Sequence, residues 1–219
     1  MARSNVAIII PAFNEESSIV TVINEVQQYG DVIIVDDGSS DSTVELVAKT
    51  SAIVLCHKSN LGYERALSTG FTHAIQESYL YIITTDADGE LRSYGINEIL
   101  GLLKKNFLLV VGRRTSKNRF IENIFGSLSF GAFGIHDPLC GMKGYSAKLY
   151  RKYGFFDTQN MIGTELLALA IRDNITIKEI PIDVQKRHGE SRFGGSLSSL
   201  LKITRVIYLF FKLCIQKKV

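Results

Sequence analysis

Short apolar runs alternate with helix-like segments through the first half of the chain, and this alternation limits the possible folds more than any other feature. Strands that are apolar on both faces, with helices between them, indicate a parallel sheet covered on both sides. Ligands of such a sheet bind at the carboxyl ends of its strands. We expect strands at 6–10, 32–35, 52–56, 79–84 and 107–112, and helices at 15–29, 41–50, 62–78 and 95–105.

The second half of the chain is less regular. Helical spacing predicts helices over 120–133 and 163–173. We also expect a strand over 175–180 and a loop with a short strand within 136–145. A length of 219 residues suits one α/β domain with a sizeable core. We therefore expect a catalytic domain over 1–195 and a C-terminal amphipathic helix over 196–219.

An acidic cluster follows the predicted strand 79–84, where Asp86, Asp88 and Glu90 stand in close succession. Two carboxylates about 4 Å apart repel each other by roughly 1 kcal/mol in water and roughly 4 kcal/mol in a partly buried site, which favours a cation between them. Oxygen ligands suit Mg²⁺ or Mn²⁺ better than zinc. A solvated acidic turn is the alternative if the cluster stands alone.

Three other predicted strands also end in polar residues, at 11–16, 36–43 and 60–62. Within 36–43, Gly38 permits a tight turn, and Asp41 is placed to cap the next helix. The carboxylates at 36 and 37 can accept hydrogen bonds from a base or a ribose. Neither common glycine-rich phosphate loop occurs in the sequence. We therefore expect metal and basic residues to hold any phosphates.

These motifs together resemble those of a known enzyme family. In order and spacing, 11–16, 35–43, 60–70, 86–90, 112–114 and 137–145 are similar to motifs of the family-two inverting glycosyltransferases. The nearest subgroup is that of the dolichyl- or polyprenyl-phosphate sugar synthases, and the resemblance covers roughly residues 5–195. It implies the GT-A fold, a Rossmann-like, mostly parallel α/β sheet with helices on both faces. It also implies hexosyl transfer from a UDP- or GDP-linked sugar to a polyprenyl or dolichyl phosphate.

The resemblance also implies roles for individual residues. There are two departures from the expected pattern. The subgroup usually has Gln where Glu90 stands, and the family often has Lys-Gly where this chain has Tyr63 and Glu64. The implied metal ligands for Mg²⁺ or Mn²⁺ are Asp86, Asp88 and Glu90. The implied donor contacts are Pro11, Ala12, Glu15, Asp37, Ser39, Asp86, Arg187 and Arg192. The implied acceptor contacts are Arg113, Arg114 and Ser191, and the catalytic residues are Asp88, Arg114 and Asp137.

Other functions stay open on the sequence. A soluble sugar or glycan acceptor would need a general base, for which Asp137 and then Glu165 are candidates, although Glu165 also suits the first turn of a helix. His188, beside two arginines, suits a polar lining better than a base. A non-catalytic module that binds nucleotide sugars is a further alternative. We expect no nucleic-acid partner, because the basic C-terminal segment lacks interleaved stacking aromatics.

The C-terminal segment has a marked excess of positive charge. Residues 183–219 contain eight Lys and Arg but only two acidic residues, whereas the whole chain has a net charge of +3. As a helix, 197–216 aligns its polar residues in one narrow stripe, formed by Ser198, Lys202, Arg205, Lys212 and Gln216. Such a helix either packs on the domain with its basic edge in water or lies in the plane of a membrane.

The location expected from these features is peripheral, on the cytoplasmic face of a membrane. The first residues lead directly into a predicted strand without a signal-peptide pattern, and no uncharged apolar run reaches roughly 18 residues. Three widely spaced cysteines suit a reducing compartment. A homo-oligomer or a separate membrane partner remains open.

Overall fold

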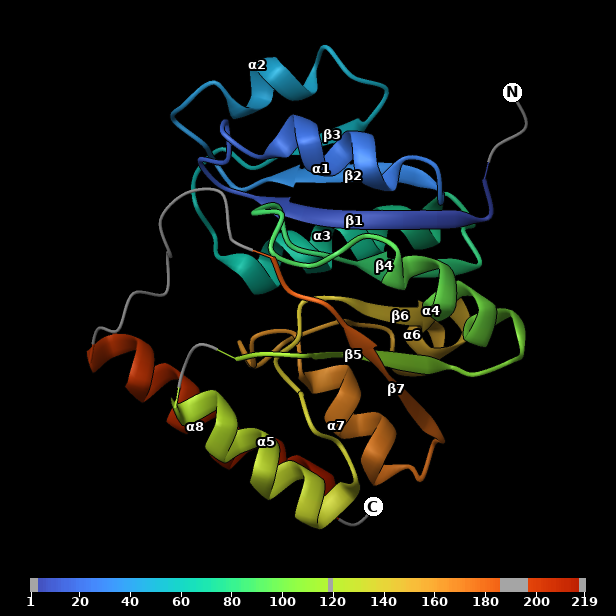
Figure 1. Ribbon diagram of the computed structural model, residues 1–219, viewed down its shortest axis with the longest axis vertical. Helices are drawn as coiled ribbons and strands as arrows, with labels where there is room; N and C mark the ends of the chain where they lie inside the picture. The colour runs from blue at the N-terminus through green and yellow to red at the C-terminus, as the bar shows by residue number, and fades with distance from the viewer. Residues whose placement is uncertain (1–3, 118–119, 186–196, 217–219) are drawn as a thin grey trace.

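The computed structural model describes residues 4–117, 120–185 and 197–216 and shows a sheet of seven strands between layers of helices (Figure 1). The spatial order of the strands is β3-β2-β1-β4-β6-β5-β7. Their bounds are β1 Val6–Ala12, β2 Asp31–Asp36, β3 Ile53–Cys56, β4 Tyr81–Thr84, β5 Leu109–Arg114, β6 Lys143–Ser146 and β7 Ile177–Ile182. The α/β class expected from the sequence is confirmed.

Strand β6 makes the sheet mixed. β1 to β4 pair in parallel, as do β5 and β7, but β6 runs antiparallel to both of its neighbours, β4 and β5. The carboxyl ends of the parallel strands therefore meet at one edge, and β6 begins at that same edge, where Lys143 pairs with Thr84. The loop that leads into β6 is thus brought beside the acidic end of β4.

Alternate residues of the central strands enter two separate cores, which explains why the strands are apolar on both faces. In β1, Ile8 and Ile10 belong to the core under α1, α2 and α4, whereas Ile9 belongs to the core under α3 and α7. All three side chains are fully buried. The helices are α1 Ile19–Val26, α2 Thr43–Val47, α3 Tyr63–Gln76, α4 Gly95–Lys104, α5 Phe120–Phe133, α6 Ala147–Tyr153, α7 Glu165–Arg172 and α8 Leu197–Ile215.

Two helices are shorter than predicted, because side chains hold the residues before them in loops. The helix expected at 15–29 begins only at Ile19, and the one expected at 41–50 only at Thr43. Thr43 Oγ1 accepts a hydrogen bond from the Glu15 N–H (2.8 Å), and Asp41 accepts one from the N–H of Thr43 (3.0 Å). These bonds fix the strand-end loops of the sheet edge. The N-cap residue of α2 is Ser42, and Asp41, one residue earlier, supports the first helical N–H, that of Thr43.

Helix α6 was not predicted. It begins after Ser146, whose hydroxyl accepts a hydrogen bond from the Lys148 N–H (3.3 Å), and it ends at Gly154, which adopts a left-handed φ of 81°. Ser146 is thus the N-cap of α6, and Gly154 is its left-handed C-cap. With only seven residues, α6 is too short for helical periodicity to stand out in the sequence.

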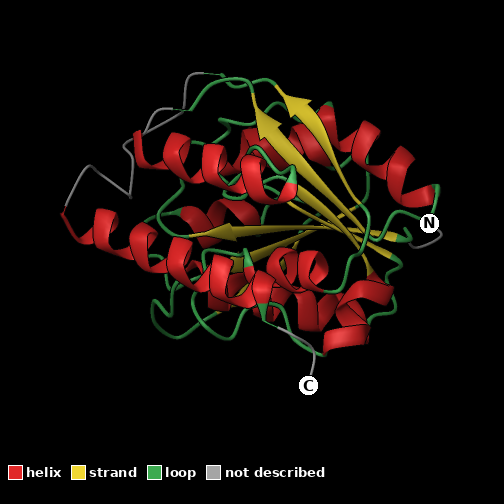
Figure 2. Ribbon diagram, turned by 90° about the horizontal axis from the view of Figure 1, so that it is seen from below, coloured by secondary structure: helices red, strands yellow, loops and turns green. Residues whose placement is uncertain are grey.

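The C-terminal helix α8 packs on the domain. Its buried stripe consists of Ile203, Val206, Phe210 and Cys214, and it contacts α7 and α5. Figure 2, seen from below, shows α5 and α8 side by side across the near face. In the described part of the chain, no helix combines the length and the apolar character needed to cross a membrane.

Candidate active site

The loops that follow β1 and β2 are bonded to each other at the sheet edge. Ser39 Oγ accepts a hydrogen bond from the Asn14 N–H (2.8 Å), and Asn14 Oδ1 accepts one from the Ser40 N–H (2.8 Å). Pro11 and Ala12 are buried in β1 just before these loops. The structure thus brings the predicted nucleoside contacts of the two strand ends together. Glu15 is buried beside them, and its carboxylate accepts a hydrogen bond from the Ser18 hydroxyl (2.9 Å).

Asp37 fixes the loop that follows β3. Its two carboxylate oxygens accept hydrogen bonds from the N–H groups of Leu61 (2.9 Å) and Gly62 (2.8 Å), and His57 Nδ1 lies 2.7 Å from Oδ1. The carboxylate is buried. Three of its bonds therefore serve the protein itself, which leaves little capacity for the predicted nucleoside contact.

Asp36, which the sequence analysis considered as an acceptor but did not include among the implied donor contacts, has one carboxylate oxygen that is free in the described part of the chain. Oδ2 accepts hydrogen bonds from the N–H groups of Gly38 and Ser39 (both 3.1 Å). Oδ1 is buried and has no hydrogen-bond partner among the residues that the structure describes. A buried carboxylate oxygen without a partner is costly, and it suits a ligand that donates a hydrogen bond.

The acidic residues after β4 lie at the same edge of the sheet. Asp88 is buried, and its Oδ1 accepts a hydrogen bond from the Glu90 N–H (2.9 Å). The backbone carbonyl of Glu90 in turn accepts one from the Gln185 N–H (2.9 Å). Across the described ranges, no three acidic, His or Cys side chains converge into a metal-binding group. Binding of a metal by Asp86, Asp88 and Glu90 together therefore stays a prediction.

Asp86 occupies a tightly enclosed position. A Cβ on Gly141 would lie only 2.1 Å from Asp86 Oδ2, so the carboxylate occupies space that only glycine leaves open. The Tyr63 hydroxyl donates to Oδ1 (3.3 Å). Burial, reinforced by the nearby charge of Asp88, raises the pKa of Asp86 to about 7. Two close carboxylates in such a place suit a hard divalent cation, whose remaining ligands would be water or phosphate oxygens.

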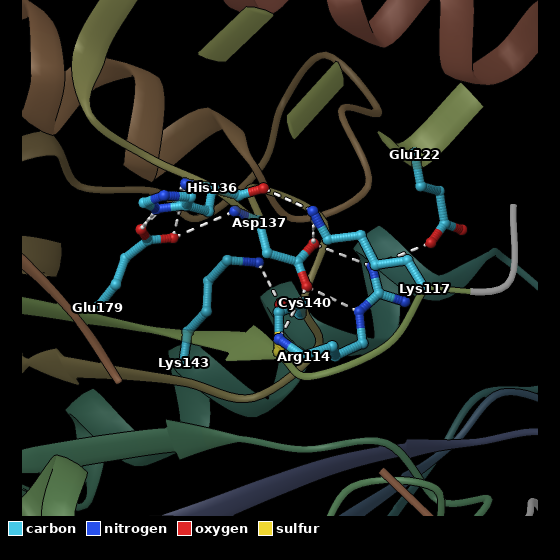
Figure 3. Close-up of polar contacts among 8 residues, drawn as sticks. All are labelled: Arg114, Lys117, Glu122, His136, Asp137, Cys140, Lys143 and Glu179. Atoms are coloured by element: carbon cyan, nitrogen blue, oxygen red, sulfur yellow. Dashed lines mark hydrogen bonds and ion pairs between the residues drawn. The ribbon is translucent and has the colours of Figure 1, made fainter. Parts of the chain in front are cut away.

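Arg114 and Asp137 form a bidentate ion pair at the end of β5 (Figure 3). Arg114 Nε and Nη2 donate to the two oxygens of Asp137 (2.8 and 2.9 Å), and Nη2 also lies 3.0 Å from Glu122 of α5. Burial lowers the pKa of the guanidinium, but the bonds and charges of the two carboxylates outweigh this and raise it. Asp137 is itself buried and also accepts the Arg114 N–H (3.1 Å), so its geometry is that of a group that orients Arg114.

A second set of charges supports the loop that carries Asp137. Glu179 of β7 accepts hydrogen bonds from the N–H groups of His136 (2.9 Å) and Asp137 (3.1 Å), and Lys117 Nζ donates to the His136 carbonyl (2.6 Å) (Figure 3). The sequence analysis missed both Glu179 and Lys117 as supports of the site. Glu179 stands in a predicted strand, where a single charge carries no signal of a distant partner.

Lys143 is a further buried cation that the sequence analysis missed. Its Nζ donates to the Cys140 carbonyl (2.6 Å), and burial lowers its pKa although the carboxylates of Asp137 and Asp86 work to raise it. Its position at the start of the antiparallel strand β6 places its charge near Asp86. Burial also raises the pKa of the Cys140 thiol to about 12, which keeps this cysteine protonated.

Glu165, the other candidate base, is fully used by the protein. Its carboxylate accepts hydrogen bonds from the N–H groups of Thr158 and Gln159 and from both of their side chains. It is buried at the start of α7 and fixes the preceding loop.

The remaining predicted residues lie at or beyond the edge of what the structure describes. Arg113 is exposed at the end of β5. Arg187, His188, Ser191 and Arg192 lie outside the described residues. Their predicted contacts with the donor and acceptor stay predictions.

Comparisons with known proteins point to one family. Residues 7–167 match the family described as glycosyl transferase family 2. A dolichyl-phosphate beta-glucosyltransferase of Trichomonas vaginalis is 27% identical over 95% of this chain and 74% of the relative. A UDP-N-acetylglucosamine–dolichyl-phosphate N-acetylglucosaminyltransferase of Methanococcus voltae is 26% identical over 83% of this chain and 86% of the relative.

Among solved structures, a glucosyl-3-phosphoglycerate synthase from Mycobacterium tuberculosis has a similar fold. It was solved with Mn²⁺, uridine-diphosphate-glucose and phosphoglyceric acid. It superposes with a TM-score of 0.73 at 20% identity, covering 97% of this chain and 80% of that one.

Proposed function

The chain belongs to glycosyl transferase family 2, and on this premise we propose that it transfers a hexose from a nucleoside-diphosphate sugar to a polyprenyl or dolichyl phosphate. One observation carries the proposal: the acidic end of β4 and the arginine end of β5 lie at the same edge of the sheet. The named dolichyl-phosphate relatives and the UDP-glucose complex of the structural relative support this choice of substrates.

The residues of the donor side fit a nucleotide sugar and a divalent cation. Asp86 and Asp88 would hold Mg²⁺ or Mn²⁺, and the bound cation would neutralise charge that develops on the leaving diphosphate. The bonded loops after β1 and β2 would hold the nucleoside, with Asp36 Oδ1 as an acceptor for a base or ribose donor. The Mn²⁺ in the structural relative supports the use of a divalent metal.

The acceptor side fits a phosphate better than a hydroxyl. A phosphate oxygen is already anionic, so it attacks the anomeric carbon without a general base, and the carbon loses its bond to the diphosphate with inversion. Both candidate bases, Asp137 and Glu165, are held by hydrogen bonds from the protein. Arg113 and Arg114 would position the acceptor phosphate, and Asp137 would hold Arg114 in place.

A soluble phosphate acceptor is the second candidate, favoured by the phosphoglyceric acid in the structural relative. A soluble phosphate acceptor would bind to the same arginines. The two candidate functions therefore differ only in whether the acceptor phosphate carries an apolar prenyl chain. With a lipid acceptor, we place the enzyme peripherally on the cytoplasmic face of a membrane, where sugar nucleotides are available.

In the deciding experiment, the purified protein is incubated with UDP-glucose, UDP-N-acetylglucosamine or GDP-mannose as the donor, in the presence of Mn²⁺, Mg²⁺ or EDTA. The acceptors are farnesyl phosphate, farnesol and 3-phosphoglycerate, and mass spectrometry identifies the products. We expect a glycosyl farnesyl phosphate that forms only with metal, and NMR of its anomeric proton reports inversion or retention. Transfer to farnesol at an equal rate, or to phosphoglycerate alone, contradicts the lipid-phosphate assignment.

The matched variant for this experiment is Asp88→Asn. It removes one metal-binding charge while keeping the shape of the side chain, so we expect turnover to fall about a hundredfold or more with an unchanged circular dichroism spectrum. Full activity in this variant contradicts the metal assignment.

A further inference from the structure

Exposed apolar side chains are concentrated on two adjacent helices. Of the eleven large apolar side chains that are exposed among the described residues, four lie on α5 and four on α8. Large exposed apolar patches on soluble proteins mark interaction surfaces, whereas isolated apolar residues do not. The eight residues are Phe120, Ile124, Leu128 and Phe130 of α5, and Leu200, Leu201, Tyr208 and Ile215 of α8.

On each helix, the exposed apolar residues form a row. Phe120, Ile124 and Leu128 follow each other at intervals of four residues, which places them on one side of α5. Leu201, Tyr208 and Ile215 are spaced by about two helical turns each, which places them on one side of α8. Phe120 is 81% exposed and Ile215 72% exposed.

The two rows belong to one surface, because the helices pack against each other. The Phe125 ring of α5 meets the Phe210 ring of α8 edge-on, with centroids 5.1 Å apart, and Phe133 lies 5.4 Å from Phe211. Figure 2 shows both helices across the same face of the molecule. We call the outward sides of α5 and α8 the two-helix face.

The charge of the two-helix face is entirely positive. Helix α8 contains no acidic residue between its bounds, and the single acid of α5, Glu122, points inward to Arg114. Exposed Arg205 and Lys212 lie along the same side of α8 as Leu201 and Tyr208, and Lys212 Nζ lies 6.0 Å from the centroid of the Tyr208 ring. Apolar side chains interleaved with cations and an aromatic ring are typical of helices that lie in a membrane surface.

We propose that the two-helix face docks onto a lipid bilayer that contains anionic lipids. Of the two arrangements expected for the C-terminal helix, packing on the domain is seen, since its stripe of Val206, Phe210 and Cys214 is buried in the protein, and membrane contact is proposed for its opposite side. The contact is shared with α5, a helix of the catalytic domain. The proposal rests on the proposed function in one respect, since a lipid acceptor gives the contact its purpose.

Helix α5 connects this face to the site. Its first turn directs Glu122 inward to Arg114 (3.0 Å) while Phe120 faces outward. A bilayer against Phe120 and Ile124 is therefore one helix thickness from the guanidinium that we assign to the acceptor phosphate.

A second copy of the chain fits this face less well. In a two-fold dimer the same patch meets itself, so Arg205 and Lys212 would face the cations of the partner copy with no acid to neutralise them. An anionic bilayer supplies the missing negative charge at the depth of the lipid head groups.

The experiment is co-sedimentation of the full chain with vesicles of phosphatidylcholine alone and with 30% phosphatidylglycerol. We expect the wild-type protein to bind the anionic vesicles at least several-fold more tightly than the neutral ones. The double variant Leu128→Ser/Leu201→Ser should lower binding to anionic vesicles about tenfold. Leu80→Ser removes a leucine that is 46% exposed outside both helices, and it should bind as the wild type does.

Thermal melts and transfer to a short water-soluble prenyl phosphate serve as controls, and both should be unchanged in the double variant. Equal vesicle binding by the double variant and the wild type overturns the proposal. A dimer in sedimentation equilibrium that the double variant abolishes also overturns it, and assigns the face to chain–chain contact. Vesicle binding that follows this pattern without transfer to any prenyl phosphate supports the face but contradicts the lipid-phosphate function, so the two failures are distinguishable.

Discussion

Lys202 of the C-terminal helix donates from Nζ to Oε1 of Glu64 in the first turn of α3, at 2.9 Å. The same oxygen accepts the Ile162 N–H (3.1 Å), and the Glu64 carboxylate is buried. Its neighbour Tyr63 donates to Asp86 at the acidic end of β4. The two residues that depart from the family's usual Lys-Gly thus connect the C-terminal helix with the predicted metal site.

This contact gives a prediction about stability. Lys202→Met leaves the buried carboxylate of Glu64 without its cation, so we expect the free energy of unfolding to fall by about 1–3 kcal/mol. Lys49→Met is the matched control, because Lys49 and Glu45 are also 2.9 Å apart but both side chains are exposed. That variant should leave the free energy of unfolding nearly unchanged, because solvent screens an exposed pair. Urea unfolding measures both, and equal losses would contradict a structural role for the Lys202–Glu64 pair.

A second prediction concerns the space around Asp86. Gly141→Ala places a methyl group where the Asp86 carboxylate lies, so we expect turnover to fall at least about tenfold as the carboxylate is displaced. Gly101→Ala is the control, since nothing lies within 4 Å of a Cβ at that helical position. It should keep full activity and gain about 0.5–1 kcal/mol of stability. Comparable transfer rates in the two variants would show that the Asp86 position is not critical.

A third prediction separates the two carboxylates around Arg114. Asp137→Asn removes the charge that is bonded to Nε, Nη2 and the backbone N–H, and should lower the free energy of unfolding by about 2–4 kcal/mol. Glu122→Gln removes only the contact at 3.0 Å, and should cost about half as much. Denaturant titration tests the order.

Turnover of the same variants tests the role of Asp137. A group that orients Arg114 should raise the KM for the prenyl phosphate acceptor when it is replaced by Asn. If Asp137 acted as a general base instead, the loss would fall on kcat, and the acidic limb of the pH–rate profile would disappear.

A fourth prediction concerns pH. Burial, together with the charges of Glu165 and Glu64, raises the pKa of Asp157 to about 6, although N–H groups of Met161 and Gly163 oppose the shift. The native state therefore holds this proton to a higher pH than the unfolded chain does. The contribution to stability is present below about pH 4 and is lost as the pH rises through about 6.

The measurement is the free energy of unfolding against pH for the wild type and Asp157→Asn. Between about pH 4 and pH 6.5, the wild type should lose on the order of 3 kcal/mol relative to the variant. A constant offset from altered hydrogen bonds does not matter, because only the difference in slope is informative. Parallel curves would rule out the raised pKa.

The sequence by itself determined the sheet and the polar edge. Strand periodicity depends only on which local faces are buried, so the runs now seen as β1 to β5 could be located from their apolar residues. Because parallel strands end at one edge of a sheet, the placement of Asp36, Ser39 and Asp86 at a common edge followed from that assignment. Element ends were less predictable, since hydrogen bonds such as Thr43 to Glu15 join separate loops.

Only the tertiary structure decided which charges pair. Nothing local in the sequence shows whether Asp137 is the partner of Arg114 or a general base. In the same way, the sequence does not show whether Lys202 pairs with Glu64 or lies in solvent. Such pairing depends on the antiparallel insertion of β6 and on the docking of α8, both of which are set by contacts between segments far apart in the chain. The same holds for the two-helix face, because the side of α8 that stays exposed depends on which side the domain buries.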